Sequence, residues 1–154
     1  MLQPVHQPVA APDLALPERF LDADRAMLAK RLWRATAEDG SEFGFELAAP
    51  RVHGTTFFQS AVARYTVRQN PEPLVVISLE LAPSAAAGLG WAIGNLHLEL
   101  SGEPARLLAP DEPALRQLLG RLQVPYGTTT AIFRPGRFAR GPLPLHELGP
   151  SHRH

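Results

Sequence analysis

Residues 29–69 contain short stretches in which polar and apolar residues alternate, the period of a half-buried strand. Four stretches fit a strand: Leu32–Thr36, Glu42–Leu47, Phe57–Gln59 and Tyr65–Arg68. In the second of them the apolar residues fall on one face: Phe43, Phe45 and Leu47. Asp39-Gly40 lies between the first two, and this dipeptide favours a tight hairpin turn. The pattern therefore predicts a small antiparallel β sheet or sandwich, which we place in an N-terminal domain over residues 18–70.

The pattern changes after residue 70. Leu74–Leu79 is a nearly continuous apolar run, as expected of a central strand buried on both faces. Helical and extended patterns then alternate: a helix that follows Pro83-Ser84 and runs to about Ile93, strands at 98–100 and 107–109, a helix after Asp111, and a strand at 128–133. The order is β-α-β-β-α-β, the split unit called ferredoxin-like. The chain as a whole is predicted to be α+β, with this domain over residues 71–134.

Local signals set the ends of the two predicted helices. Pro83-Ser84 offers an N-cap for the first, and Gly94-Asn95 are residue types preferred for a left-handed C-terminal cap. Asp111 is a good N-cap for the second, with Pro113 in its first turn. Its apolar stripe consists of Leu115, Leu118, Leu119 and Leu122.

Proline marks the ends of the chain and its middle. There are 16 prolines among 154 residues, about 10% against a usual ~5%. Residues 1–17 are therefore predicted to be an irregular or extended arm, either a mobile terminus or a polyproline segment for a partner. Pro71 and Pro73 stiffen the chain at a domain boundary. Residues 135–154 have no period and are predicted to be a flexible tail.

Composition excludes several classes of function. Lys plus Arg and Asp plus Glu both number 15, which disfavours a strongly basic nucleic-acid binder. The absence of cysteine excludes disulfides, thiolate zinc sites, iron–sulfur clusters and a cysteine nucleophile. No apolar run approaches the ~20 residues that cross a bilayer, and the N-terminus lacks the features of a secretory signal. We expect a soluble cytoplasmic protein.

Candidate chemistry is sparse outside the histidines. We find no hydrolase triad and no phosphate loop. Gly88-x-Gly90-x-x-x-Gly94 resembles a dinucleotide fingerprint but lies inside the predicted helix, where it favours close helix packing instead. Trp91 on the same helix is predicted to be core or to cover a subunit contact. No catalytic constellation is present, so an enzyme is not expected.

Histidine is the remaining candidate metal ligand. His6 and His53 stand alone in predicted loops, where solvated side chains are expected. His97 follows the predicted helix cap and is either structural or a ligand. His152 and His154 are two residues apart, so on an extended chain both rings reach one ion, and His146 joins them if the tail folds back. Because a ligating imidazole must be neutral, metal binding should weaken as pH falls through about 6.5.

These residues also carry a family resemblance. Gly94-Asn95-Leu96-His97 after an alanine-rich helix, followed by Leu107-Leu108 and a helix opening at Asp111, resembles the urease accessory protein E (UreE) family of nickel metallochaperones. The segment Arg31–Thr36, the Asp39-Gly40 turn and the histidine-bearing tail are similar to that family as well. Three features depart from the family pattern: Leu96 stands where arginine is usual, the N-terminal arm is proline-rich where the family usually begins with a strand, and the tail is not densely histidine-rich.

The resemblance implies an N-terminal β domain that contacts partners, a ferredoxin-like metal-binding domain and a homodimer. It maps the family's motif histidine onto His97 and its tail histidines onto His152 and His154, with His146 as a further candidate. It implies Ni(II) as cargo, with Zn(II) or Cu(II) binding in vitro. The implied partners are the urease apoprotein and other accessory proteins, including the GTPase, with no nucleic acid and no membrane. The alternative is a metal-independent protein-interaction module with incidental histidines.

Overall fold

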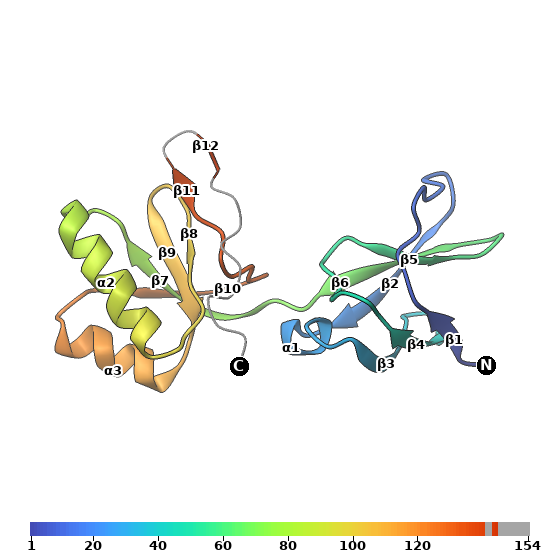
Figure 1. Cartoon of the computed structure of the whole chain (residues 1–154), viewed down its shortest axis with the longest axis horizontal. Coiled ribbons are helices and arrows are strands. Elements are labelled where there is room, and N and C mark those ends of the chain that lie inside the picture. The colour runs from blue at the N-terminus through green and yellow to red at the C-terminus, as the bar shows by residue number, and fades with distance from the viewer. Residues whose placement is uncertain (141–142, 145–154) are drawn as a thin grey trace. The chain divides into compact units, whose positions relative to one another are not determined.

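A computed structural model describes residues 1–140 and 143–144 of the chain. The chain divides into two compact units, Met1–Asn70 and Pro71–His154 (Figure 1). Helices and sheets are both present, so the predicted α+β class is confirmed. Among the described residues no helix has the length and apolar character that a membrane span requires.

The first unit is built from two three-stranded sheets, ordered β1-β4-β3 and β2-β6-β5. Its elements are β1 (Gln3–Val5), β2 (Glu18–Ala23), α1 (Arg25–Leu28), β3 (Leu32–Thr36), β4 (Glu42–Glu46), β5 (Thr56–Gln59) and β6 (Arg64–Gln69). β3 pairs with β4 and β5 with β6 in the antiparallel sense, but the β1–β4 and β2–β6 pairs are parallel. The expectation of a purely antiparallel domain is therefore wrong, because both parallel pairs join strands far apart in sequence, which a local pattern does not reveal.

The predicted hairpin between β3 and β4 is confirmed. Gly40 has a φ of 85° in the turn, a conformation that glycine adopts without steric cost. The Asp39 carboxylate accepts hydrogen bonds from the Ser41 N–H at 3.0 Å and from the Tyr65 hydroxyl at 2.9 Å. These bonds, with that of Ser41 the larger cause, hold the pKa of Asp39 below its ordinary value. The Asp39 side chain thus ties the turn to β6, and backbone hydrogen bonds between Ala37 and Ser41 and between Gly40 and Ala37 close the turn itself.

Aromatic rings fill the core of the first unit. Phe43 and Phe45 on the predicted apolar face are fully buried. Trp33 stacks on Phe45 with ring centroids 3.9 Å apart, and Phe43 meets Phe57 edge to face at 5.0 Å. Aromatic pairs in these geometries stabilise a core by about 0.5–1.5 kcal/mol beyond their buried area. The alternation read from the sequence therefore identifies the side of β4 that faces the core.

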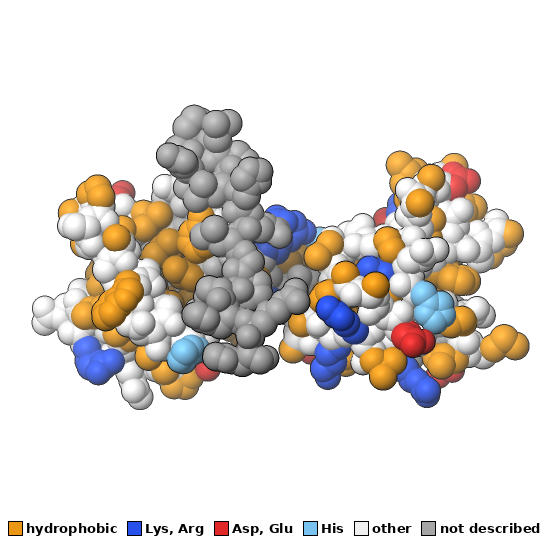
Figure 2. All heavy atoms as spheres, in the orientation of Figure 1, with side chains coloured by type: hydrophobic (Ala, Val, Ile, Leu, Met, Phe, Trp, Pro, Cys, Tyr) orange, Lys and Arg blue, Asp and Glu red, His pale blue; other side chains and the backbone are white. Residues whose placement is uncertain are grey.

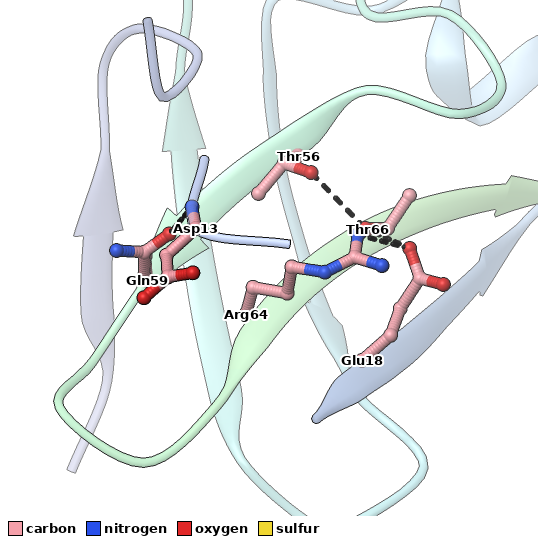
Figure 3. A network of polar contacts seen from close by, with 6 residues as sticks. All are labelled: Asp13, Glu18, Thr56, Gln59, Arg64 and Thr66. Atoms are coloured by element: carbon pink, nitrogen blue, oxygen red, sulfur yellow. Dashed lines mark hydrogen bonds and ion pairs between the residues drawn. The ribbon is translucent and has the colours of Figure 1, made fainter. Parts of the chain in front are cut away.

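A chain of polar contacts joins three strands of the second sheet (Figure 3). The Thr66 hydroxyl on β6 donates to Glu18 Oε1 on β2 at 2.8 Å and lies 3.2 Å from the Thr56 hydroxyl on β5. Arg64 donates to the same Glu18 oxygen. Because Thr56 and Thr66 are buried, these contacts satisfy polar groups that would otherwise destabilise the sheet.

β1 lies inside the segment predicted to be an irregular or extended arm. It runs along β4, with Val5 buried opposite Phe45. Pro4 sits at the centre of β1 and donates no ladder hydrogen bond, which is tolerated because β1 is an edge strand. The prolines of the arm therefore did not prevent strand formation there.

The second unit contains a four-stranded sheet ordered β10-β7-β9-β8, in which every neighbouring pair is antiparallel. Its elements are β7 (Glu72–Ser78), α2 (Pro83–Asn95), β8 (Ser101–Gly102), β9 (Arg106–Pro110), α3 (Pro113–Arg121) and β10 (Gly127–Ala131). A separate pair, β11 (Ala139–Arg140) and β12 (Leu143–Pro144), lies within the segment expected to lack regular structure. The predicted order β-α-β-β-α-β is observed.

Both helices cover the same face of this sheet (Figure 1). Val75 and Ile77 of β7 belong to the core cluster that contains residues of both helices. Leu74 faces the other side, where Leu108 and Phe133 complete a smaller cluster. β7 is thus buried on both faces, as predicted.

The predicted helix starts are wrong by one residue or more. Ala82 is the N-cap of α2 and Glu112 that of α3, and neither makes a side-chain capping bond. The prolines that follow occupy the first helical turn, where a missing N–H costs nothing. Asp111 instead accepts two hydrogen bonds from Arg116, at 2.6 and 2.7 Å. Those bonds and the positive charge hold the pKa of Asp111 below its ordinary value.

Candidate metal centre

His97 lies at the corner where α2 ends. α2 continues through Gly94 and Asn95, so the prediction that these residues form a left-handed cap is wrong. His97 itself takes the left-handed conformation, with a φ of 57°, and its N–H donates to the Gly94 carbonyl at 2.9 Å. Histidine is among the few residues enriched in this region outside glycine. The candidate ligand therefore follows the C-cap of α2, Leu96.

Hydrophobic anchors flank this corner. Leu96 and Leu98 are partly buried against the core between helices and sheet, while His97 between them is exposed. Residues 98–100 form no strand, contrary to prediction, and β8 begins only at Ser101. Alternating leucines at 98 and 100 serve here to anchor a coil. The imidazole is accordingly accessible to a ligand although the chain on each side of it is held in place.

The other predicted ligands, His146, His152 and His154, lie outside the described residues, so the structure does not test them. Within residues 1–140 and 143–144 no group of three or more histidine, aspartate or glutamate side chains is placed to hold a metal ion. His97 in one chain offers a single ring, so a tight site requires ligands from elsewhere.

The two histidines of the first unit have other contacts. His53 is half-buried, and its Nδ1 accepts the Gln69 N–H at 3.1 Å, so the expectation of a solvated side chain is wrong for it. His6 is exposed, with Nδ1 3.8 Å from a Glu46 carboxylate oxygen. His53 thus has a structural contact, at the point where β6 ends.

The outer face of α2 exposes one large aromatic side chain, that of Trp91. Trp91 is 72% exposed, so the core interpretation of this residue is wrong and the subunit-contact interpretation remains. Its exposed neighbours on the same face are small or polar: Ser84, Ala87, Gly88, Gly94 and Asn95. Figure 2 shows hydrophobic side chains reaching the surface over α2. We call these six residues the α2 stripe, and His97 lies two residues beyond its last member, Asn95.

The glycines of α2 do not form a phosphate site. Gly88, Gly90 and Gly94 all lie within the helix, so their amides serve helical hydrogen bonds. A Cβ on Gly90 would lie 3.9 Å from Leu100, whereas a Cβ on Gly88 or Gly94 would meet no atom of the described residues within 4 Å. Among the three glycines, Gly90 is thus the one that packs against another part of the described chain.

Sequence reasoning missed one feature beside this corner. Gly136–Phe138, which we call the strap, contacts Leu100 and Gly102 although it belongs to the predicted tail. Contacts between residues about 35 apart have no periodic signal. The only available sign was the glycine at position 102, since glycine in a strand often marks close approach by another backbone.

Comparison with known proteins identifies the family. Residues 72–154 match the family model described as UreE urease accessory protein, C-terminal domain. The urease accessory protein UreE of Rhodobacter capsulatus is 30% identical over 138 residues, covering 87% of this chain and 84% of the relative. The protein of the same name from Bifidobacterium longum subsp. infantis is 32% identical over 87 residues, 56% of this chain and 39% of the relative. The chain belongs to the UreE family of urease accessory proteins.

Proposed function

We propose that the protein is a homodimeric metallochaperone that delivers Ni(II) during urease maturation. One observation carries the proposal: in a UreE family chain, an exposed His97 stands at the end of a helix whose outer face exposes Trp91. The strand order of the second unit supports a ferredoxin-like metal-binding domain. Nickel is the cargo, and no catalytic role is proposed.

The dimer supplies the second ligand in this proposal. A residue near a two-fold axis meets its own copy, so a contact through the α2 stripe would bring two His97 rings together. Trp91 is the anchor of that contact, since large aromatic side chains contribute most to interfaces of this kind. Imidazole suits nickel, copper and zinc. His146, His152 and His154 complete the coordination in this proposal.

In this proposal the ion can be released because its ligands come from two different parts of the chain, the corner at His97 and the tail. Histidines at the fixed corner hold the ion, and tail histidines leave one at a time as a recipient binds. The recipients we propose are the urease apoprotein and the other accessory proteins, including the GTPase, with the first unit contacting partners. We place the protein in the cytoplasm.

Nickel titration of the untagged protein tests this function. Wild type, His97→Ala and a variant with alanine at 146, 152 and 154 are compared by calorimetry, with mass measured by light scattering. We expect a dimer that loses nickel binding in His97→Ala, a smaller loss in the tail variant, and weaker binding at pH 6.0 than at pH 7.5, because protons compete for imidazole.

The metal-independent interaction module gives a different result. In that case His97→Ala and the fall in pH leave nickel binding unchanged, while complex formation with urease accessory proteins persists without metal. Nickel affinity that is the same in all three proteins therefore contradicts the proposed function.

A further inference from the structure

The strap covers the free edge of β8 just beyond the His97 corner. β8 is the last strand in the sheet order and has two residues. The Gly102 N–H donates to the Arg137 carbonyl at 2.7 Å, and Gly102 forms a parallel bridge with Phe138. The Gly136 N–H donates to the Leu100 carbonyl at 2.9 Å. The strap thus continues the sheet as an added parallel segment; Figure 1 shows the chain passing β8 on its way to β11.

Gly102 and Phe138 fit each other closely. A Cβ at position 102 would lie 2.7 Å from Cδ1 of the Phe138 ring and 3.4 Å from Leu107. Real Cβ atoms do not approach other atoms to 2.7 Å, so any other residue at 102 must displace the ring or the strap. The absence of a side chain at Gly102 is therefore what allows the aromatic ring to sit over β8.

Leu100 connects the strap to α2. Its carbonyl accepts the Gly136 N–H, and its side chain lies beside Gly90 of the helix. Residues 98–100 make up a coil, so they lack the ladder hydrogen bonds that would hold a strand. The corner is consequently fixed on one side by the bond from His97 to Gly94 and on the other by the strap.

We propose that the strap is a positioning element for His97. By holding Leu100 and Gly102, it keeps the corner in one arrangement and presents the imidazole to the metal without reorganisation. The proposal rests on the proposed function, in which His97 is a ligand. Groups that orient metal ligands typically change affinity by about 10–100-fold when they are lost, so the strap should affect nickel binding although none of its residues is proposed to bind the ion.

Two substitutions in the full chain test the strap from opposite sides. Phe138→Ala removes the ring, and Gly102→Ala pushes it away. We expect each to weaken nickel binding in calorimetry by about tenfold and to accelerate hydrogen exchange at the Gly102 amide. Phe138→Leu keeps most of the packing and should retain most of the affinity. Leu118→Ala is the matched control, because it weakens the core of the same unit on α3 without altering a strap residue.

Comparison with Leu118→Ala separates positioning from general stability. If the strap acts through His97, Phe138→Ala and Gly102→Ala weaken nickel binding whereas Leu118→Ala leaves it unchanged. An equal loss of affinity in Leu118→Ala overturns the proposal, as does unchanged nickel affinity in Phe138→Ala and Gly102→Ala despite faster exchange at Gly102. Those results leave the proposed function standing. Unchanged affinity in His97→Ala alone contradicts the proposed function, and the strap proposal falls with it.

Discussion

His97 occupies a backbone conformation that a side chain disfavours. Left-handed φ places Cβ close to the following carbonyl oxygen, at a cost of about 1–2 kcal/mol for most residues. Gln123, with a φ of 54°, occupies the equivalent position after α3. The Gln123 N–H donates to the Gly120 carbonyl, and the Val124 N–H donates to the Leu119 carbonyl. Both helices therefore end on a left-handed residue other than glycine. Glycine would suit the backbone at either position, but at 97 it removes the proposed ligand.

This geometry predicts opposite effects of glycine on stability and on metal binding. Relief of the left-handed strain, offset by about 0.4–1 kcal/mol of unfolded-state entropy, should leave His97→Gly roughly 1 kcal/mol more stable than His97→Ala. Both variants should lose nickel binding. Gln123→Gly is the control, with a similar gain over Gln123→Ala and unchanged nickel affinity. Denaturant unfolding and calorimetry measure the two effects, and a His97→Gly protein that still binds nickel as wild type would contradict ligation by this ring.

At the scale of elements, hydrophobic periodicity correctly predicted the buried faces of individual strands. β4 and β7 have the expected faces buried because alternation and apolar runs reflect burial directly. The strand expected at 98–100 is a coil, since the same leucine spacing also suits two anchors against a helix. Leu122, expected on the apolar stripe, is the C-cap of α3 and 49% exposed. Local sequence signals thus identified the elements, and they were wrong where packing against another element determines the secondary structure or the burial of a residue.

The parts of the candidate site divide in the same way. His97 was found because its residue type and its place after a helix are both local. Its left-handed backbone was assigned to Gly94 and Asn95, because propensity favours those residues and the extent of the helical hydrogen bonds is not visible in sequence. The strap was not predicted because Gly102 and Phe138 are far apart in sequence and come together when the strap pairs with the edge of the sheet.

The exposed face of α2 leads to a prediction about the dimer. Because Trp91 is 72% exposed, Trp91→Asp should leave the circular dichroism spectrum unchanged, while a buried charge in the proposed contact disfavours the dimer. We expect a monomer by light scattering, with nickel binding weakened as the paired His97 rings separate. Val62→Asp is a matched control in the first unit, since Val62 is 74% exposed and should not alter the mass. If Trp91→Asp remains a dimer and binds nickel with unchanged affinity, the α2 stripe is not the contact between the two subunits.

At the scale of the whole molecule, each unit has buried clusters of its own. The aromatic cluster draws its residues from Val5 to Val67, and the two clusters of the second unit lie between Leu74 and Phe133. β6 ends at Gln69 and β7 begins at Glu72, so only two residues connect the units. Separate cores favour separate unfolding. A ligand held by the second unit should then stabilise that unit without stabilising the other.

Nickel-dependent hydrogen exchange tests this independence in the intact protein. A ligand at 100 times its dissociation constant stabilises the state that binds it by about 2.7 kcal/mol. We therefore expect the slowest amides of β7 and β9 to exchange about a hundredfold more slowly with nickel, while those of β4 and β6 do not change. His97→Ala with nickel is the control and should show no slowing in either unit. Equal slowing in both units would mean that they unfold together. Nickel binding in the second unit would then also stabilise the first unit, through which contact with partners is proposed.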